Sequence, residues 1–249
     1  MSAPEVSIVV PVYNEEGSLP VLVEEIRAAM AAAATEYELL LVDDGSSDGS
    51  PAVLARLAAA EPRIRVLRLR RNSGQSAALA AGFAHARGEV VVTLDADLQN
   101  DPADIPRLLA ALDGCDVVCG VRTARQDDWV RRLSSRIANG VRNRLTHESV
   151  TDVGCTLRAC RAEHLRRIPV WKGMHRFLPT LLRMEGARVR EVPVRHRARR
   201  YGQAKYGIGN RLWRGLADLL AVRWMQSRRI DRGNVEEVTA WHSNTTPSG

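Results

Sequence analysis

The sequence lacks several signatures that would assign it to a well-marked class. It contains no Gly-x-Gly-x-x-Gly and no Gly-x-x-x-x-Gly-Lys-Ser/Thr motif, which disfavours dinucleotide cofactors and P-loop ATP chemistry. Aromatic residues are only 4% of the chain, whereas RNA-binding surfaces interleave them with basic residues. No apolar run approaches the length of a membrane span, and no signal-peptide segment follows Met1. These absences predict a cytoplasmic protein.

The cysteines offer no sign of a metal or redox site. They form no Cys-x-x-Cys pair and have no histidine at a metal-binding spacing, so we expect small buried residues. At 249 residues, with 45% hydrophobic and 26% charged residues, the chain can bury the core of one large α/β domain with an appended element.

Charge is unevenly distributed along the chain. Residues 1–119 carry 9 basic and 18 acidic side chains, a net charge of −9, whereas residues 120–229 carry 26 and 8, a net charge of +18. An arginine-rich half suggests contact with anions such as phosphates, nucleic acid or a membrane surface. The alternative is a solvated basic surface in a protein that favours arginine, since Lys172 and Lys205 are the only lysines.

Apolar segments alternate with helical patterns through the first 120 residues. We expect strands at 6–12, 38–44, 64–69, 90–95 and 116–120, and helices near 17–33, 49–60, 75–87 and 103–112. Strands that are apolar on both faces, with helices between them, predict a mostly parallel α/β sheet covered by helices on both faces. Further along, 187–197 alternates like an edge strand, and 130–145 and 208–226 have the period of amphipathic helices.

Polar residues follow four of these strands directly, at the sheet edge where α/β proteins bind ligands. In "VVVTLDADLQNDP", Asp95, Asp97 and Gln99 alternate after a buried strand, so we expect their side chains to converge. Two carboxylates repel each other unless a positive charge lies between them, and oxygen ligands suit Mg²⁺ or Mn²⁺ rather than zinc. The alternative is that these residues cap the next helix.

The other three clusters are "PVYNEE", "LVDDGSSDGS" and "RRNSGQSAAL". Tyr13 and Asn14 have the chemistry to hold a nucleobase and ribose, and Asp43 or Asp44 could accept a hydrogen bond from a base N–H. The third cluster offers a helix start where a phosphate could lie. Each cluster alone is compatible with turn and helix-cap chemistry. Four clusters at successive strand ends favour a binding site.

These segments carry a family resemblance. "VSIVVPVYNEE", "LVDDGSSDGS", "RNSGQSAALAAGF" and "LDADLQNDP", in this order, resemble the family 2 glycosyltransferases with the nucleotide-sugar-binding GT-A fold. More narrowly, "DADLQ", "DVGCTLRACR" and "RRYGQAKYG" are similar to the polyprenyl-phosphate branch, which includes dolichol-phosphate mannose synthases and undecaprenyl-phosphate sugar transferases. The resemblance covers residues 5–226. It implies a GT-A catalytic domain over 1–206, with a nucleotide-sugar half at 1–120 and an acceptor half at 121–206.

The resemblance also implies residue roles. Asp95, Asp97 and Gln99 match the metal triplet that would hold Mg²⁺ or Mn²⁺ on the donor diphosphate. The nucleotide-sugar pocket would consist of Pro11, Tyr13, Asn14, Glu15, Asp43, Asp44, Gly74, Gln75, Asp95 and Ala96. The acceptor phosphate would be received by Arg122, Arg131, Ser135, Arg199 and Lys205. Catalysis is assigned to Asp97, Arg122, Arg199 and Lys205. One departure is Ala204, where the family commonly has serine, so one hydroxyl contact is missing while the cations remain.

The chemistry of a lipid phosphate agrees with these roles. A phosphate monoester already carries about −1.5 to −2 charges at neutral pH, so it needs positioning and charge compensation rather than a general base. The metal would neutralise charge developing on the leaving nucleoside diphosphate. A single in-line attack with inversion at the anomeric carbon is the simplest mechanism, and cell-envelope glycan synthesis is the implied context. The donor base, uridine or guanosine, and the sugar stay open.

A lipid acceptor implies contact with a membrane. We expect 207–226 to be a helix in the membrane interface, helped by 130–145, with Trp213 and Trp224 at the boundary, and 227–249 to be a flexible tail. The protein would then be peripheral on the inner face of the cytoplasmic membrane. Many members of the family continue into transmembrane helices, so a separate transmembrane partner could supply them here. The alternative is that both amphipathic helices pack on the sheet.

Two other functions compete with this interpretation. A GT-A enzyme acting on a polysaccharide or another hydroxyl acceptor would need a carboxylate base, and Arg199 and Lys205 would have no task. A non-catalytic module could bind RNA or anionic lipid through the arginine-rich half. The low aromatic content and the acidic clusters disfavour that module, so we expect no nucleic-acid partner.

Overall fold

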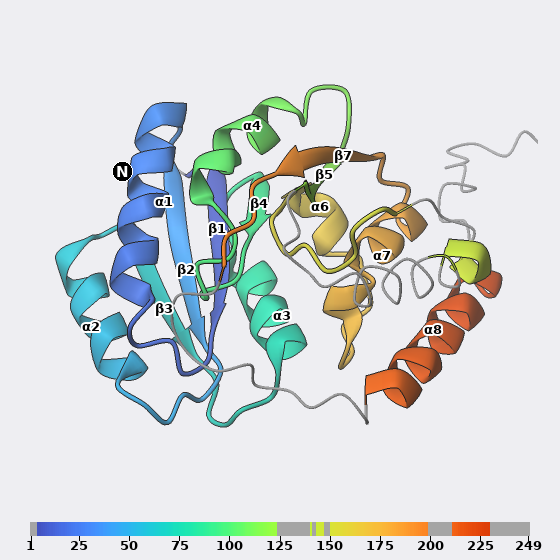
Figure 1. Ribbon diagram of the computed structural model, residues 1–249, viewed down its shortest axis with the longest axis horizontal. Coiled ribbons are helices and arrows are strands. Elements are labelled where there is room, and N and C mark those ends of the chain that lie inside the picture. Colours follow the sequence, from blue (N-terminus) through green and yellow to red (C-terminus); the bar gives the residue numbers. More distant parts are fainter. Residues whose placement is uncertain (1–3, 124–139, 141–142, 147–149, 199–210, 230–249) are drawn as a thin grey trace, which may run out of the picture.

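The computed structural model describes residues 4–123, 140, 143–146, 150–198 and 211–229. Seven strands form one sheet in the order β3-β2-β1-β4-β6-β5-β7 (Figure 1). The strands are β1 (Val6–Val12), β2 (Tyr37–Asp43), β3 (Ile64–Arg68), β4 (Val90–Thr93), β5 (Val117–Arg122), β6 (Arg158–Arg161) and β7 (Val189–Val194). All neighbours pair in parallel except β6, which is antiparallel to both β4 and β5. The predicted mostly parallel sheet is confirmed.

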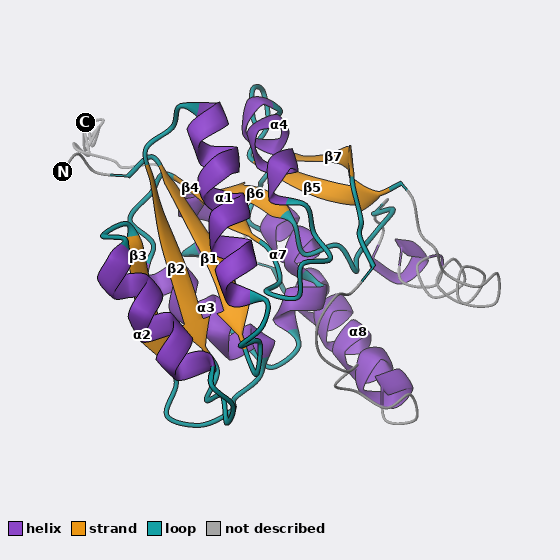
Figure 2. Cartoon of the chain, turned by 60° about the vertical axis from the view of Figure 1, so that its left-hand side comes forward, coloured by secondary structure: helices purple, strands orange, loops and turns teal. Residues whose placement is uncertain are grey.

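Helices cover both faces of this sheet. They are α1 (Leu19–Ala33), α2 (Ser50–Ala60), α3 (Gln75–His85), α4 (Ile105–Ala110), α6 (Ala162–Leu165), α7 (Leu178–Met184) and α8 (Arg211–Ser227), with 3-10 turns η1 (Pro102–Asp104) and η2 (Met174–Arg176). Figure 2 shows α1 in front of the central strands. The predicted strands and helices of the first 120 residues are present, with boundaries shifted by a few residues. β7 is an edge strand, as predicted.

Two apolar cores lie on the two sides of the sheet. Because successive strand residues point to opposite faces, Ile8 and Val10 join the core with α1, α2 and α4. Val9 joins the core with α3, α6, α7 and α8. The central strands β1, β2 and β4 are therefore buried on both faces, which is why they read as continuous apolar runs in the sequence.

The approach of α3 to β1 depends on a glycine. An ideal Cβ at Gly82 would lie 2.2 Å from Cγ1 of Val9. Val9 is fully buried and β-branched, so it has little freedom to move aside. The helix can therefore pack this closely on the strand only without a side chain at position 82.

We expect Gly82→Ala to lower the free energy of unfolding by about 1–3 kcal/mol through overpacking. Gly215→Ala in α8 is the control, because nothing lies within 4 Å of an added Cβ there. That substitution should raise stability by up to about 1 kcal/mol through helix propensity. Urea denaturation measures both, and a Gly82→Ala protein as stable as the Gly215→Ala protein would contradict this account of the packing.

Candidate active site

The acidic segment after β4 forms a turn. β4 ends at Thr93, and the chain turns at 96–97, with Leu98 in the left-handed region at φ 61°. The strand-like alternation expected for Asp95, Asp97 and Gln99 is therefore wrong, because the strand stops before these residues. The turn nevertheless places all three residues within a few positions of the carboxyl end of β4, a central strand of the sheet.

Hydrogen bonds hold the carboxylates of this turn. Asp97 is 6% exposed, and its Oδ1 accepts a hydrogen bond from the backbone N–H of Gln99 at 3.1 Å. Oδ1 of Asp95 accepts one from Nε2 of Gln75 at 2.8 Å. Gln75 is the first residue of α3, and the cap residue Gly74 before it has φ 92°, a conformation that favours glycine. The predicted pocket residues Gln75 and Asp95 are thus in direct contact.

The loops after β1 and β2 are bound to each other. Asn14, at φ 53°, donates its N–H to Oγ of Ser46 at 3.0 Å, and its Oδ1 accepts from the N–H of Ser47 at 2.8 Å. The N–H of Glu15 donates to Oγ of Ser50 at 2.9 Å, and the Glu15 side chain is buried. Asn14 and Glu15, which were predicted to bind the nucleotide sugar, therefore hold the loops after β1 and β2 together.

The two aspartates after β2 have different surroundings. Both oxygens of Asp44 accept backbone N–H groups, from Ser73 at 2.7 Å and from Gly74 at 2.8 Å, so Asp44 anchors the loop that leads into α3. Asp43 accepts from the N–H of Ser46 at 2.9 Å through Oδ1. Its buried Oδ2 receives no hydrogen bond in the described chain and lies 3.3 Å from Nε of Arg68. Asp43 is therefore the better placed of the two to accept from a ligand.

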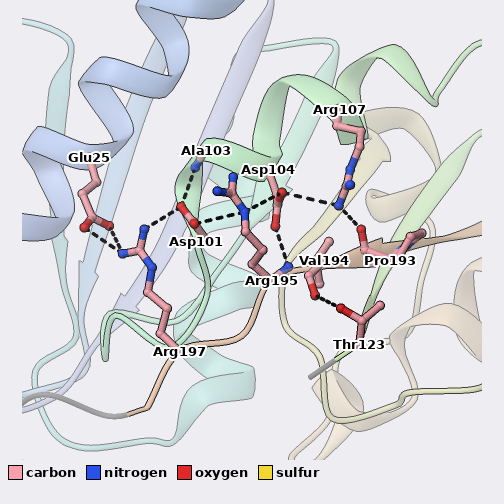
Figure 3. A network of polar contacts seen from close by, with 10 residues as sticks. All are labelled: Glu25, Asp101, Ala103, Asp104, Arg107, Thr123, Pro193, Val194, Arg195 and Arg197. Carbon is pink, nitrogen blue, oxygen red and sulfur yellow. Dashed lines mark hydrogen bonds and ion pairs between the residues drawn. The ribbon is translucent and has the colours of Figure 1, made fainter. Parts of the chain in front are cut away.

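Two arginines that follow β7 bind acids of α1 and of η1 with its cap residue (Figure 3). Arg197 contacts Oε1 of Glu25 at 2.7 Å and Oδ1 of Asp101 at 2.7 Å. Arg195 lies 3.2 Å from Asp101 and 3.3 Å from Asp104 through its Nε. The backbone N–H of Arg197 also donates to the carbonyl oxygen of Gln99 at 2.9 Å. The chain that leads to residue 199 is thus attached to the Asp95–Gln99 turn.

Arg122, predicted to contact the acceptor phosphate, is ion-paired. Its Nε and Nη2 donate to the two carboxylate oxygens of Asp152 at 2.7 and 2.8 Å, and its backbone N–H donates to Oδ2 at 3.2 Å. Such a bidentate pair fixes the orientation of the guanidinium group. The sequence analysis assigned no role to Asp152, although it opens the quoted motif "DVGCTLRACR".

The remaining predicted residues divide into two groups. Pro11 and Tyr13 are half-buried at the end of β1, and Ala96 is buried in the turn after β4. Four predicted acceptor residues lie outside the described residues: Arg131, Ser135, Arg199 and Lys205.

Comparison with known proteins assigns the family. The model of Glycosyl transferase family 2 matches residues 7–168. This chain belongs to the family 2 glycosyl transferases. It is 47% identical over 206 residues to undecaprenyl-phosphate 4-deoxy-4-formamido-L-arabinose transferase of Edwardsiella ictaluri. That match covers 82% of this chain and 63% of the relative, so the chain spans less than two thirds of the relative's length.

Solved structures show that this glycosyl transferase has the GT-A fold. The mannosyltransferase PcManGT from Pyrobaculum calidifontis, in complex with GDP-Man and Mn²⁺, matches with a TM-score of 0.62 and 22% identity, over 93% of this chain and 66% of that one. Glucosyl-3-phosphoglycerate synthase from Mycobacterium tuberculosis, in complex with Mn²⁺, UDP-glucose and phosphoglyceric acid, matches with a TM-score of 0.68 and 20% identity, over 92% and 82%. The predicted fold and family are confirmed.

The residues of the Asp95–Gln99 turn fit a magnesium-type site. In the described part of the chain, no group of three or more His, Cys, Asp or Glu side chains is placed to hold a metal ion. The turn instead offers two aspartates and an amide oxygen. Mg²⁺ commonly takes one or two carboxylates and completes its shell with water and substrate phosphates. This donor set therefore suits a hard cation that arrives with a diphosphate.

We expect Asp44→Asn to lower the free energy of unfolding by about 1–3 kcal/mol, because the amide cannot accept from both Ser73 and Gly74 and loses one charge-assisted hydrogen bond. Asp113→Asn on the exposed surface is the control and should change stability by less than about 0.5 kcal/mol. Chemical denaturation measures both. Equal effects would show that Asp44 does not anchor the loop before α3.

Proposed function

We propose that this glycosyl transferase moves a sugar from a nucleoside-diphosphate sugar to the phosphate of a polyprenyl lipid, with Mg²⁺ or Mn²⁺ and with inversion at the anomeric carbon. The observation that carries the proposal is the 47% identity, across 82% of the chain, to an enzyme named for undecaprenyl phosphate. The structural neighbours that hold GDP-Man or UDP-glucose with Mn²⁺ support a nucleotide-sugar donor and a divalent cation.

The donor side of the reaction is assigned to the carboxyl edge of the sheet. Asp95, Asp97 and Gln99 would hold the cation, which supplies positive charge to the leaving diphosphate. Tyr13 and the buried Oδ2 of Asp43 are the groups of the nucleoside pocket with the chemistry to contact a base. The contacts of Asp44 with the loop before α3 keep this edge preorganised.

The acceptor side is assigned to arginine and lysine. Arg122 is held by Asp152, which fixes its orientation at the end of β5. Arg199 and Lys205 follow Arg197, whose backbone is bound to Gln99 in the donor turn. These cations would receive a phosphate that is already deprotonated, so the transfer needs no carboxylate base.

The direct test is transfer of radiolabelled sugar by the purified protein. A panel of UDP- and GDP-sugars is incubated with undecaprenyl phosphate and Mn²⁺, with EDTA in a parallel series. EDTA-sensitive label in the lipid phase is the expected result, and the active donor identifies the base and the sugar. Label that appears only with a polysaccharide or another hydroxyl acceptor would overturn the assignment of the acceptor.

We expect Asp97→Asn to lower sugar transfer by at least about a hundredfold, because one carboxylate that would bind the cation is lost. Metal-dependent donor binding, measured by calorimetry with UDP or GDP and Mn²⁺, should weaken in parallel, whereas binding to lipid vesicles should not change. Asp113→Asn serves as the control with wild-type turnover. Normal turnover by Asp97→Asn would contradict the metal assignment.

We also propose that α8 attaches the protein to the membrane surface. Its apolar residues divide between the core and the surface. Leu219 and Val222 are buried in the core, whereas Leu216, Leu220 and Trp224 are 40%, 56% and 63% exposed. These three recur every fourth residue, so they share one helix face. Arginines at 223, 228 and 229 are exposed nearby, as suits an anionic interface.

No helix in the described residues has both the length and the hydrophobicity to cross a membrane. Attachment through an exposed helix face requires neither the length nor the hydrophobicity of a membrane-spanning helix. The apolar side chains of such a face enter the boundary between headgroups and acyl chains while basic residues contact anionic lipid. The exposed stripe of α8 is the part of the described surface that combines these two properties.

We expect the triple substitution of Leu216, Leu220 and Trp224 by serine to weaken binding to phosphatidylglycerol-containing vesicles by at least about tenfold, because each large side chain loses its apolar burial. Val170→Ser is the control, since Val170 is an exposed apolar residue outside α8. Vesicle sedimentation at low salt measures the binding. Retention of wild-type binding by the triple variant would exclude this face as the membrane contact.

A further inference from the structure

We propose that Ser76 and His175 are positioning residues for Asp95 and act through Gln75. The inference rests on the proposed function, because it assumes that Asp95 helps to hold a divalent cation. It concerns a contact between residues 99 positions apart in the chain, Oγ of Ser76 and Nδ1 of His175, which lie 2.8 Å from each other.

Gln75 and Ser76 are the first two residues of α3, and their side chains have different partners. The amide of Gln75 donates to Asp95 at 2.8 Å, on the side of the carboxylate turn. The hydroxyl of Ser76 meets the loop that ends in η2. Successive helix residues point about 100° apart, so fixing one of them fixes the direction of the next. The contact of Ser76 therefore sets the direction from which Gln75 reaches Asp95.

The hydrogen bonds around Ser76 have a defined direction. The backbone N–H of Gly173 donates to Oγ of Ser76 at 3.0 Å, so the hydroxyl proton is available for Nδ1 of His175. Nδ1 can accept this proton only while the imidazole is neutral. Burial, with added repulsion from Arg176 and Arg158, lowers the pKa of His175 to about 4. In the tautomer that carries its proton on Nε2, the neutral histidine accepts from the Ser76 hydroxyl through Nδ1.

The loop that carries His175 is itself fixed. Arg158, 2% exposed on β6, donates to the carbonyl oxygen of His175 at 3.2 Å and to that of Val153 at 3.0 Å. Gly173, at φ 112°, leaves space for Asp218 of α8, because a Cβ there would lie 2.7 Å from Oδ2 of Asp218. A rigid loop can transmit a constraint to the start of α3, whereas a loose loop could not.

Residues that orient metal ligands affect affinity without contacting the metal. Loss of such an outer contact typically weakens metal binding about 10- to 100-fold. Gln75→Leu should therefore weaken Mn²⁺ binding by about tenfold or more. Ser76→Ala, which loses one hydrogen bond behind Gln75, should weaken it by about fivefold. His175→Leu should behave like Ser76→Ala, and His175→Asn should restore binding because its Oδ1 can accept from the Ser76 hydroxyl.

The test is a double-mutant cycle on Mn²⁺ affinity. Free Mn²⁺ is measured by electron paramagnetic resonance for the full chain, alone and with UDP or GDP. If Ser76 acts through Gln75, then Ser76→Ala has no further effect in the Gln75→Leu background. Ser76→Cys, which keeps the shape of the side chain but has only a weak hydrogen-bond donor, replaces Ser76→Ala if that variant does not fold.

Ser7→Ala is the matched control. Ser7 is a fully buried serine at the start of β1, with hydrogen bonds to Glu38 and Gly88 at the opposite end of the sheet. It should lose stability and keep wild-type Mn²⁺ affinity. The inference is overturned if Ser76→Ala behaves like Ser7→Ala, or if its effect on affinity is equal in both backgrounds. Wild-type protein that binds no Mn²⁺ would instead overturn the metal site of the proposed function, and the inference with it.

Discussion

Repulsion among carboxylates is the constraint on which the structure of the carboxyl edge of the sheet depends. Parallel strands deliver their carboxyl ends to one side of the sheet, so the acids that follow β2 and β4 gather there. Each must be compensated by a donor or a cation, since an uncompensated buried charge is costly. Asp44 is compensated by backbone N–H groups of the loop before α3, and Asp95 by the amide of Gln75. The same contacts connect consecutive loops, so charge compensation also builds the site.

The acids at η1 are compensated by arginine side chains from a distant part of the chain. Asp101 and Asp104 lie beside Arg195 and Arg197, which come about 90 positions later in the chain, just after β7. These ion pairs join the acidic first half of the chain to the basic second half. The unequal charge of the two halves, visible in the sequence, is therefore in part an attraction between them. On the proposed function, the same attraction holds Arg195 and Arg197, which precede the predicted acceptor residues in the chain, against the acids that follow the donor turn.

The sequence predicted β1, β2, β4 and β5 well because most of their residues are buried and apolar, and β3 because most of its residues are apolar. It missed β6, whose four residues begin and end with arginine, because a buried Arg158 gives no apolar signal. The turn after β4 was mistaken for a strand end, since alternating acids look alike in both. Partners such as Asp152 and His175 could not be predicted, because their roles arise from contacts between distant parts of the chain. The roles assigned to Arg199 and Lys205 stay predictions, because both residues lie outside the described part of the chain.

On the proposed function, a lipid acceptor imposes one more requirement, because its phosphate would lie at a membrane interface while the donor is dissolved in water. An enzyme that joins them must hold its donor edge at a fixed position relative to that interface. α8 has one face in the core, through Leu219 and Val222, and its Asp218 pairs with Arg176 of η2 at 3.6 Å. η2 also carries His175, which contacts the start of α3. The helix with the exposed apolar face is therefore packed against the loop that supports the donor carboxylates. A membrane bound by α8 would then lie at a fixed position relative to these carboxylates.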